Sequence, residues 1–303
     1  KSRRMSPRNL VSITQTVYGC LMQDISPSAT SLFDTRPWRR IALSRLEAAR
    51  AVPTMLSETE QKLYYWLTRH WAAGRGAIVD LGCFAGGSTA RLALGHAEAG
   101  LTTPIHAYDR FTAQARVKRR VLYPQGISPF DGEDILPLAR ELLRPWQAHI
   151  TLHRGQIEEQ HWQNGPIEIL VMDAGKTAPD LDRMAQIFFP HLVPGTSILV
   201  QQDYLQWNQP WVAVQMELLA DVFVPRAHAR PDTVVWECTA PVTADVLARA
   251  QVADLSDEMM LAYLELAYER FEGWNLGRRI DTLIRAMRAN PGQRAAHDFN
   301  RRP

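Results

Sequence analysis

The chain has 303 residues, which is enough for one large domain with extensions or for two modest ones. Its content of 46% hydrophobic and 22% charged residues is ordinary for a globular protein and excludes a disordered or fibrous chain. The 34 Lys and Arg residues nearly balance the 32 Asp and Glu residues, so the net charge of +2 predicts neither a nucleic acid nor a membrane surface as a partner.

The apolar residues predict strands and helices that alternate along the middle of the chain. A helix is expected over residues 56–71, because apolar residues recur at helical spacing behind Ser57, with Glu60 three residues later as in a capping box. The expected strands cover residues 77–81, 104–108, 148–153, 167–172 and 197–202, and the expected helices cover residues 88–96, 134–143, 180–189 and 212–219. Such alternation predicts a parallel sheet with helices on both faces.

Two further strands are expected after this alternation, at residues 222–225 and 233–238. The short polar segment between them contains Pro231, which suits an antiparallel hairpin at the edge of the sheet. The expected fold is therefore α/β and Rossmann-like, with a mostly parallel seven-stranded sheet. We divide the chain into a partly helical N-terminal extension (residues 1–52), a core domain (53–240) and a helical C-terminal extension (241–303).

A glycine-rich turn joins the first strand to its helix within residues 77–90. Glycines at such a turn let the backbone bend sharply and let a ligand approach the main chain at the start of the next helix. The glycines are spaced GxxxGG and not GxGxxG as in a dinucleotide site, and they stand at Gly82, Gly86 and Gly87. Asp80 would repel a pyrophosphate but can accept hydrogen bonds from an ammonium group, and Asp109, after the second strand, can accept ribose hydroxyls. The two acids favour S-adenosylmethionine as the ligand.

With these features, the chain from Pro53 to Cys238 resembles the class I S-adenosylmethionine-dependent methyltransferases. It is most similar to the divalent-cation-dependent O-methyltransferases of the macrocin, caffeoyl-CoA and catechol types. The resemblance implies that the cofactor is held by Asp80, Gly82, Gly86, Gly87, Ser88, Asp109, Gln156 and Asp173. Residues 55–60 are similar to a segment that closes over the cofactor in the caffeoyl-CoA group, which implies contacts from Met55, Ser57 and Glu60. A helix cap packed on the core is the alternative interpretation.

Two more aspartates stand where expected strands end, Asp173 and Asp203, and Lys176 follows the first by three residues. Strand ends on one side of such a sheet converge on one crevice. Hard oxygen ligands can hold Mg²⁺ against an acceptor hydroxyl, and a lysine of lowered pKa can take the proton. The resemblance implies these roles: Asp173 and Asp203 as metal ligands and Lys176 as the base. A solvated surface lysine is the alternative interpretation of Lys176.

The third metal ligand departs from the family pattern. Gln202 and Tyr204 stand where the family has an acid or an asparagine, and Gln202 offers only a neutral carbonyl oxygen. Transfer with Mg²⁺ and transfer without a metal therefore both stay open. A third interpretation is that the aspartates only cap strand-to-helix turns.

Two regions are candidates for the acceptor side of the site. Residues 110–132 show no clear periodicity and form a long connection, which is typical of a lid, and they include the basic run 118–120. The aromatic residues Tyr204, Trp207 and Trp211 form either a wall for the acceptor or part of the packing between helix and sheet.

The sequence as a whole predicts an S-adenosylmethionine-dependent methyltransferase that acts on a hydroxyl of a small-molecule or sugar-containing metabolite. The alternatives are a metal-independent N- or O-methyltransferase of the same fold and a non-catalytic cofactor-binding or scaffold protein. No nucleic acid or membrane partner is expected, and a homo-oligomer would form through the helical extensions. The three cysteines are odd in number and form no CxxC pair, which favours the cytosol.

Overall fold

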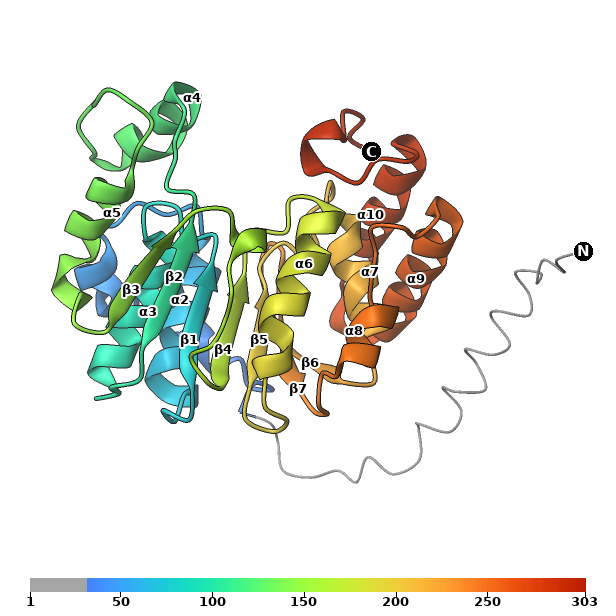
Figure 1. Cartoon of the computed structure of the whole chain (residues 1–303), viewed down its shortest axis with the longest axis horizontal. Helices are drawn as coiled ribbons and strands as arrows, with labels where there is room; N and C mark the ends of the chain where they lie inside the picture. Colours follow the sequence, from blue (N-terminus) through green and yellow to red (C-terminus); the bar gives the residue numbers. More distant parts are fainter. Residues whose placement is uncertain (1–31) are drawn as a thin grey trace, which may run out of the picture.

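The structure is a computed structural model, and residues 32–303 of it are described. Seven strands form one sheet in the order β3-β2-β1-β4-β5-β7-β6 (Figure 1). The strands are β1 (Ala77–Leu81), β2 (Ile105–Asp109), β3 (Ile150–Arg154), β4 (Ile167–Met172), β5 (Ile198–Gln201), β6 (Phe223–Ala229) and β7 (Thr233–Cys238). The first five run parallel, and β7 pairs antiparallel with both β5 and β6. The expected Rossmann-like sheet with its antiparallel edge pair is confirmed.

Helices follow most of the parallel strands, as the alternation predicted. They are α2 (Glu58–Trp66), α3 (Gly87–Glu98), α4 (Ala115–Val117), α5 (Leu136–Leu143), α6 (Ala178–Phe188), α7 (Pro210–Leu218), α8 (Ala244–Arg249), α9 (Asp257–Arg270) and α10 (Gly277–Ala289). Helix α2 begins with the expected capping box: the Ser57 hydroxyl accepts from the Glu60 N–H, and the Glu60 carboxylate accepts from the Ser57 N–H. Of the expected N-terminal extension, residues 1–31 lie outside the described part of the chain, and the remainder holds two 3₁₀ helices.

Apolar side chains on neighbouring strand positions point to opposite faces of the sheet. Ile78 packs in a cluster with residues of α2 and α3, whereas Val79 packs with residues of α6 and α7. Both are fully buried. A strand buried on both faces reads as a continuous apolar run, which is why β1 and β4 were recognisable from the sequence.

The C-terminal helices belong to the same core as the sheet. Met260 and Leu264 of α9 and Leu283 of α10 lie in one buried cluster with Trp211 of α7. The Arg270 guanidinium binds the buried Glu217 carboxylate, with Nε 2.8 Å from Oε1. Helices α9 and α10 therefore extend the layer over one face of the sheet and are not a separate module.

Two of the three cysteines, Cys83 and Cys238, are buried free thiols, and Cys20 lies outside the described residues. Within residues 32–303, no helix is both long enough and apolar enough to cross a membrane.

A buried carboxylate fixes the turn that leads into β1. Glu168 of β4 accepts the backbone N–H groups of Ala73 at 2.8 Å and of Gly74 and Arg75 at 3.0 Å. We expect Glu168→Ala to lower the free energy of unfolding by about 2–4 kcal/mol, because these N–H groups lose their acceptor. Urea unfolding measures the loss. The control Glu265→Ala removes an exposed ion pair with Arg288 and should change stability by less than about 0.5 kcal/mol; equal losses in both variants would contradict the prediction.

Candidate cofactor and acceptor site

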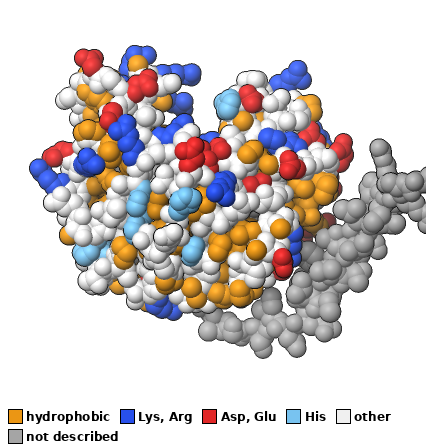
Figure 2. Space-filling view, viewed as in Figure 1, with side chains coloured by type: hydrophobic (Ala, Val, Ile, Leu, Met, Phe, Trp, Pro, Cys, Tyr) orange, Lys and Arg blue, Asp and Glu red, His pale blue; other side chains and the backbone are white. Residues whose placement is uncertain are grey.

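The site lies at the carboxyl ends of β1 and β4, where the strand order reverses. Such a switch point leaves a crevice, because the connections on its two sides turn to opposite faces of the sheet. The two loops touch here: the Asp173 N–H donates to the Leu81 carbonyl at 2.9 Å. Gly82 has φ +95°, and a Cβ on it would lie 2.6 Å from the Asp173 carbonyl oxygen, so no other residue fits without strain. Figure 2 shows a notch along this edge of the molecule, with acidic side chains on its floor.

Four predicted acids come together at this edge. Asp80 is the penultimate residue of β1, Asp109 ends β2, and Asp173 and Asp203 follow β4 and β5. Their charges act on one another: Asp109 contributes to a raised pKa of Asp80, and Asp203 and Asp80 contribute to a raised pKa of Asp173. The convergence expected from strand ends is present in the structure.

Asp80 is fully buried and only half satisfied. Its Oδ2 accepts the hydroxyls of Ser88 at 2.7 Å and Thr89 at 2.6 Å. Its Oδ1 is buried and has no hydrogen-bond partner among the described residues. Burial raises the pKa of Asp80 to about 6. A buried carboxylate oxygen without a donor is costly unless a ligand supplies one. Thr89 was not predicted, although a second hydroxyl on the first turn of a helix was a visible signal.

The remaining glycines of the loop serve close packing. A Cβ on Gly86, which has φ +93°, would lie 2.7 Å from the Leu143 side chain. A Cβ on Gly87 would lie 2.4 Å from the Pro53 carbonyl oxygen. Gly86 precedes α3 without a side-chain cap, so the first N–H groups of α3 are left for another acceptor.

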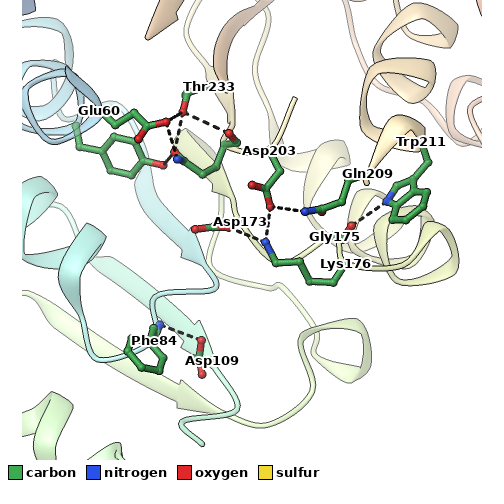
Figure 3. Close-up of polar contacts among 12 residues, drawn as sticks. Glu60, Phe84, Asp109, Asp173, Gly175, Lys176, Asp203, Gln209, Trp211 and Thr233 are labelled. Atoms are coloured by element: carbon green, nitrogen blue, oxygen red, sulfur yellow. Dashed lines mark hydrogen bonds and ion pairs between the residues drawn. The ribbon is translucent and has the colours of Figure 1, made fainter. Parts of the chain in front are cut away.

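Asp109 joins the glycine loop to the end of β2 (Figure 3). Its Oδ2 accepts the Phe84 N–H at 2.9 Å, and its Oδ1 accepts the Phe111 N–H at 2.7 Å. Burial raises its pKa above the usual value. Each carboxylate oxygen keeps a second lone pair, so Asp109 can still accept hydroxyl groups. Gln156 lies beside it, because the N–H of the preceding Gly155 donates to the Asp109 carbonyl at 3.1 Å.

Lys176 bridges the two acids of the acceptor side (Figure 3). Its Nζ lies 3.0 Å from Asp173 Oδ1 and also contacts Asp203 Oδ2. Burial by itself lowers the pKa of Lys176, but attraction from Asp173 and Asp203 outweighs it and holds the pKa above the ordinary value. The expected lysine of lowered pKa is thus not what this geometry produces: Lys176 is a cation and has no lone pair with which to accept a proton.

Gln202 points away from Asp173 and Asp203. Its Oε1 accepts the Tyr64 hydroxyl at 2.6 Å, and its Nε2 donates to Glu60 Oε1 at 2.9 Å. The Thr233 hydroxyl lies within hydrogen-bond distance of both residues, at 2.9 Å from Gln202 Oε1 and 2.7 Å from Glu60 Oε1. The oxygen expected to bind a metal is therefore engaged in a buried network with Tyr64 and Thr233, which sequence reasoning did not foresee.

This network predicts the effect of an acid at position 202. Gln202→Glu would place a second carboxylate against Glu60 and should lower the free energy of unfolding by about 2–4 kcal/mol at neutral pH. One of the two carboxyl groups would have a raised pKa in the folded state, so the loss should shrink as the pH falls. Urea unfolding at pH 5 and pH 7.5 measures this. Gln186 lies on the exposed face of α6, so the control Gln186→Glu should change the free energy of unfolding little. If Gln202→Glu is as stable as wild type at both pH values, the Gln202 side chain does not take part in the network.

Residues 53–57 pack against the start of α3 at Gly87. The three residues predicted here to contact the cofactor, Met55, Ser57 and Glu60, differ in their surroundings. Met55 is 65% exposed. The Ser57 hydroxyl donates to the Arg230 carbonyl at 2.6 Å, and Glu60 is buried in the network described above. The capping role of Ser57 and Glu60 is present; their contact with a cofactor, and that of Met55, stays a prediction.

Residues 110–132 are more ordered than the sequence indicated. They contain α4, a π-helix (Lys118–Leu122) and a 3₁₀ helix (Tyr123–Gln125). The buried Lys118 ammonium donates to the carbonyls of Phe130 at 2.8 Å and Gly132 at 2.7 Å, so it holds the segment together. Gln125 pairs with the backbone of Thr54, with its Oε1 3.0 Å from the Thr54 N. Arg119 and Arg120 are exposed.

Of the three aromatic residues near the acceptor side, two belong to the core. Tyr204 is fully buried between Trp236 and Phe271, and Trp211 is fully buried with its Nε1 donating to the Gly175 carbonyl at 2.9 Å. Packing therefore accounts for both. Trp207 is only partly buried.

Gln209 was missed by the sequence reasoning. Its Nε2 donates to Asp203 Oδ2 at 3.0 Å, and its Oε1 is buried without a partner among the described residues. Nothing in the local pattern marks it, because its role depends on the path of the chain between β5 and α7.

The donor set does not fit a divalent ion. The space between Asp173 and Asp203 is bridged by the Lys176 ammonium, and Gln202 turns its oxygen elsewhere. Within residues 32–303, no group of three or more His, Cys, Asp or Glu side chains is placed to hold a metal.

Residues 79–202 match the family model described as a methyltransferase domain. The matched region runs from β1 to just past β5, contains Asp80, Asp109 and Asp173, and ends one residue before Asp203. Over this region the chain is therefore similar to methyltransferase domains. No curated protein matches the chain.

Solved structures resemble the chain at low identity. A proposed O-methyltransferase from Klebsiella pneumoniae is 14% identical, with 76% of this chain and 97% of that chain covered and a TM-score of 0.43. The cofactor-bound protein Rv0187 from MTB is 14% identical, with coverage of 78% and 99% and a TM-score of 0.40. The SAH-bound methyltransferase PaMTH1 from Podospora anserina is 12% identical, with coverage of 89% and 91% and a TM-score of 0.36. Similarity at this level carries no argument about the acceptor or the chemistry.

Proposed function

We propose that this protein is an S-adenosylmethionine-dependent methyltransferase that methylates a hydroxyl oxygen of a small-molecule or sugar-containing metabolite. One observation carries the proposal: Asp80, at the switch point beside the glycine loop, has a buried carboxylate oxygen without a partner among the described residues. A charged donor such as an ammonium group binds a carboxylate oxygen roughly twice as strongly as a neutral donor does. The match to a methyltransferase domain covers this strand and loop.

The residues present fit the three parts of the cofactor. In this proposal Asp80 binds the ammonium of the methionine part, and the uncapped N–H groups of α3 bind its carboxylate. Asp109 accepts the ribose hydroxyls, and Gln156 contacts the adenine. Ser88 acts through Asp80, to which its hydroxyl donates. Gly82, Gly86 and Gly87 let the loop pack closely against other segments of the same chain. Met55 and Ser57 would close over the cofactor from the segment before α2.

Asp173 is the residue best placed to take the proton of the acceptor. Its Oδ1 binds Lys176, whereas its Oδ2 has no partner among the described residues, and its side chain is 27% exposed. Burial raises the pKa of Asp173, which suits a general base near neutral pH. The acceptor O–H proton passes to Asp173, an O–CH₃ bond forms as the S–CH₃ bond breaks, and the electron pair of that bond stays on the sulfur.

Two alternatives use the same cofactor site. A nitrogen acceptor would need Asp173 and Asp203 only to orient the amine, since a neutral amine attacks without losing a proton first. A non-catalytic cofactor-binding protein would use the cofactor residues and need no base at Asp173. We extend the proposal to a small acceptor and to a cytosolic protein without a nucleic acid or membrane partner. Assembly through the helical extensions stays a prediction.

Calorimetry tests the cofactor directly. S-adenosylhomocysteine is expected to bind with one site per chain, and NAD is expected to show no heat of binding because the glycine spacing is wrong for a dinucleotide. A folded protein that binds NAD and not S-adenosylhomocysteine would contradict the proposed function. A screen of phenols, catechols and sugar nucleotides with S-adenosylmethionine then identifies the acceptor.

A further inference from the structure

The charges on the acceptor side are arranged around Lys176. Its ammonium has three N–H donors, two of which are directed to Asp173 and Asp203. The third has no partner within residues 32–303, and the side chain is 50% exposed. Two carboxylates at the ends of β4 and β5 therefore share one cation, and that cation has a donor left for a ligand.

The loop that carries Lys176 is held by the segment at residues 293–299. The Lys176 carbonyl accepts the Ala296 N–H at 2.8 Å, and the Ala178 N–H donates to the Arg294 carbonyl at 2.8 Å. Asn208 Nδ2 donates to the Ala296 carbonyl at 2.9 Å and ties the same segment to the chain after β5. The C-terminal segment thus holds the backbone of Lys176, and Asp173 and Asp203 hold its ammonium. A donor held in place before the reaction stabilises developing charge without a reorganisation cost.

A divalent ion would have to displace this arrangement. It would occupy the space between Asp173 and Asp203 only after the Lys176 ammonium had left, and it would find no third acid and no free amide oxygen from Gln202. Mg²⁺ is often held by one or two carboxylates and completes its octahedral shell with waters, so the obstacle here is the Lys176 ammonium, which occupies the space between the two carboxylates and repels a cation.

We propose that Lys176 is the resident cation of the acceptor site, and that its ammonium binds the acceptor oxygen through its third N–H and makes methyl transfer independent of a divalent ion. This inference rests on the proposed function for the identity of the reaction. The charge that a metal would supply to a developing oxyanion comes from the chain itself. Asp173 receives the proton, Lys176 binds the oxygen, and Asp203 with Gln209 holds the Lys176 side chain in position.

Manganese titration of the full-length chain, followed by electron paramagnetic resonance, tests the inference without an acceptor. Wild type is expected to leave the free Mn²⁺ signal unchanged, with or without S-adenosylhomocysteine. Lys176→Met leaves two neighbouring carboxylates without their cation and should bind Mn²⁺ measurably, at least about tenfold more tightly than the upper limit that the wild-type titration sets. Lys176→Arg keeps the charge and should behave as wild type. The control Lys62→Met should also behave as wild type, because Lys62 pairs with the exposed Glu58 on α2.

Stoichiometric Mn²⁺ binding by wild type that is lost in Asp203→Asn would overturn the inference. So would a folded Lys176→Met with no gain in Mn²⁺ affinity. If Lys176→Met does not fold, the Mn²⁺ titrations of wild type and Lys176→Arg still test the inference, because binding by either protein would contradict it. Once an acceptor is known, turnover should be unchanged by EDTA, whereas activity that EDTA removes and Mg²⁺ restores would count against a resident lysine cation. Absence of S-adenosylhomocysteine binding would refute the proposed function. The Mn²⁺ titration would still show whether Lys176 excludes a divalent ion from the space between Asp173 and Asp203.

Discussion

Asp80→Asn is expected to weaken S-adenosylhomocysteine binding by about 10- to 100-fold, because a charge-assisted hydrogen bond contributes about 1.5–3 kcal/mol. The carboxylate Oδ1 is buried and without a partner among the described residues, so its binding energy is available to a ligand ammonium. An amide keeps the shape of the side chain and can still accept from Ser88 and Thr89, but it lacks the charge. Calorimetry of wild type and variant measures the difference.

Asp80 should also make the affinity for S-adenosylhomocysteine depend on pH, with weaker binding at low pH. Burial raises the pKa of Asp80 to about 6 in the unliganded protein, and the ligand ammonium requires the ionised form. Affinity should therefore fall as the pH drops below about 6, by up to about tenfold per pH unit. Asp80→Asn should lack this dependence. A raised carboxyl pKa also means that the folded protein binds the proton more tightly than the unfolded chain, so the contribution of Asp80 to stability increases as the pH falls through 6.

Asp182→Asn is the matched control for Asp80. Asp182 is also a buried carboxylate, but its oxygens accept the N–H groups of Val252 and Ala253 far from the glycine loop. Its replacement should lower stability and leave the affinity for S-adenosylhomocysteine unchanged. If the two variants lose affinity equally, Asp80 acts through the fold and not through the ligand.

The sheet was predictable because each central strand is a short apolar run bounded by turns. The expected bounds of β1, β4 and β7 agree with the structure to the residue. Strand β6 continues past Pro225 to Ala229, beyond its expected end, because Pro225 lies at an irregularity in the pairing with β7 on the edge of the sheet. Proline is tolerated at such a position.

Long-range side-chain contacts were not predictable. Residues 110–132 lack helical periodicity, yet they fold into short helices because the Lys118 ammonium binds two carbonyls more than ten residues away. Gln202 is held by Glu60 and Tyr64, which are more than 130 residues earlier in the chain. Neither contact has a local sequence signal.

Within the candidate site, too, the features set by the order of strands were predictable and those set by side-chain contacts were not. Asp80, Asp109, Asp173 and Asp203 converge because strand ends in a parallel sheet converge, and that rule needs only the order of elements. The ionisation of Lys176 depends on distances of a few ångströms to Asp173 and Asp203, so the sequence offered a base where the structure places a cation.

Asp173→Asn is expected to lower kcat by about 10²- to 10⁴-fold, the range typical of a lost general base. The affinity for S-adenosylhomocysteine should change by less than about threefold, because the hydrogen bonds of Asp80 and Asp109 are untouched. The measurement is turnover with the acceptor that the screen identifies, together with calorimetry on the same preparation. An amide at position 173 still accepts from Lys176, so the fold around the loop should persist.

The pH profile separates proton transfer by Asp173 from a structural role. Burial raises the pKa of Asp173 in the wild type, so kcat should rise with pH as this carboxyl group ionises and then reach a plateau. The residual activity of Asp173→Asn should lack that rise, since the amide does not titrate. A residual activity that keeps the wild-type pH dependence would assign the proton to another group, and Asp203 would be the next carboxylate to replace, because it shares Lys176 and lies at the end of the adjacent strand.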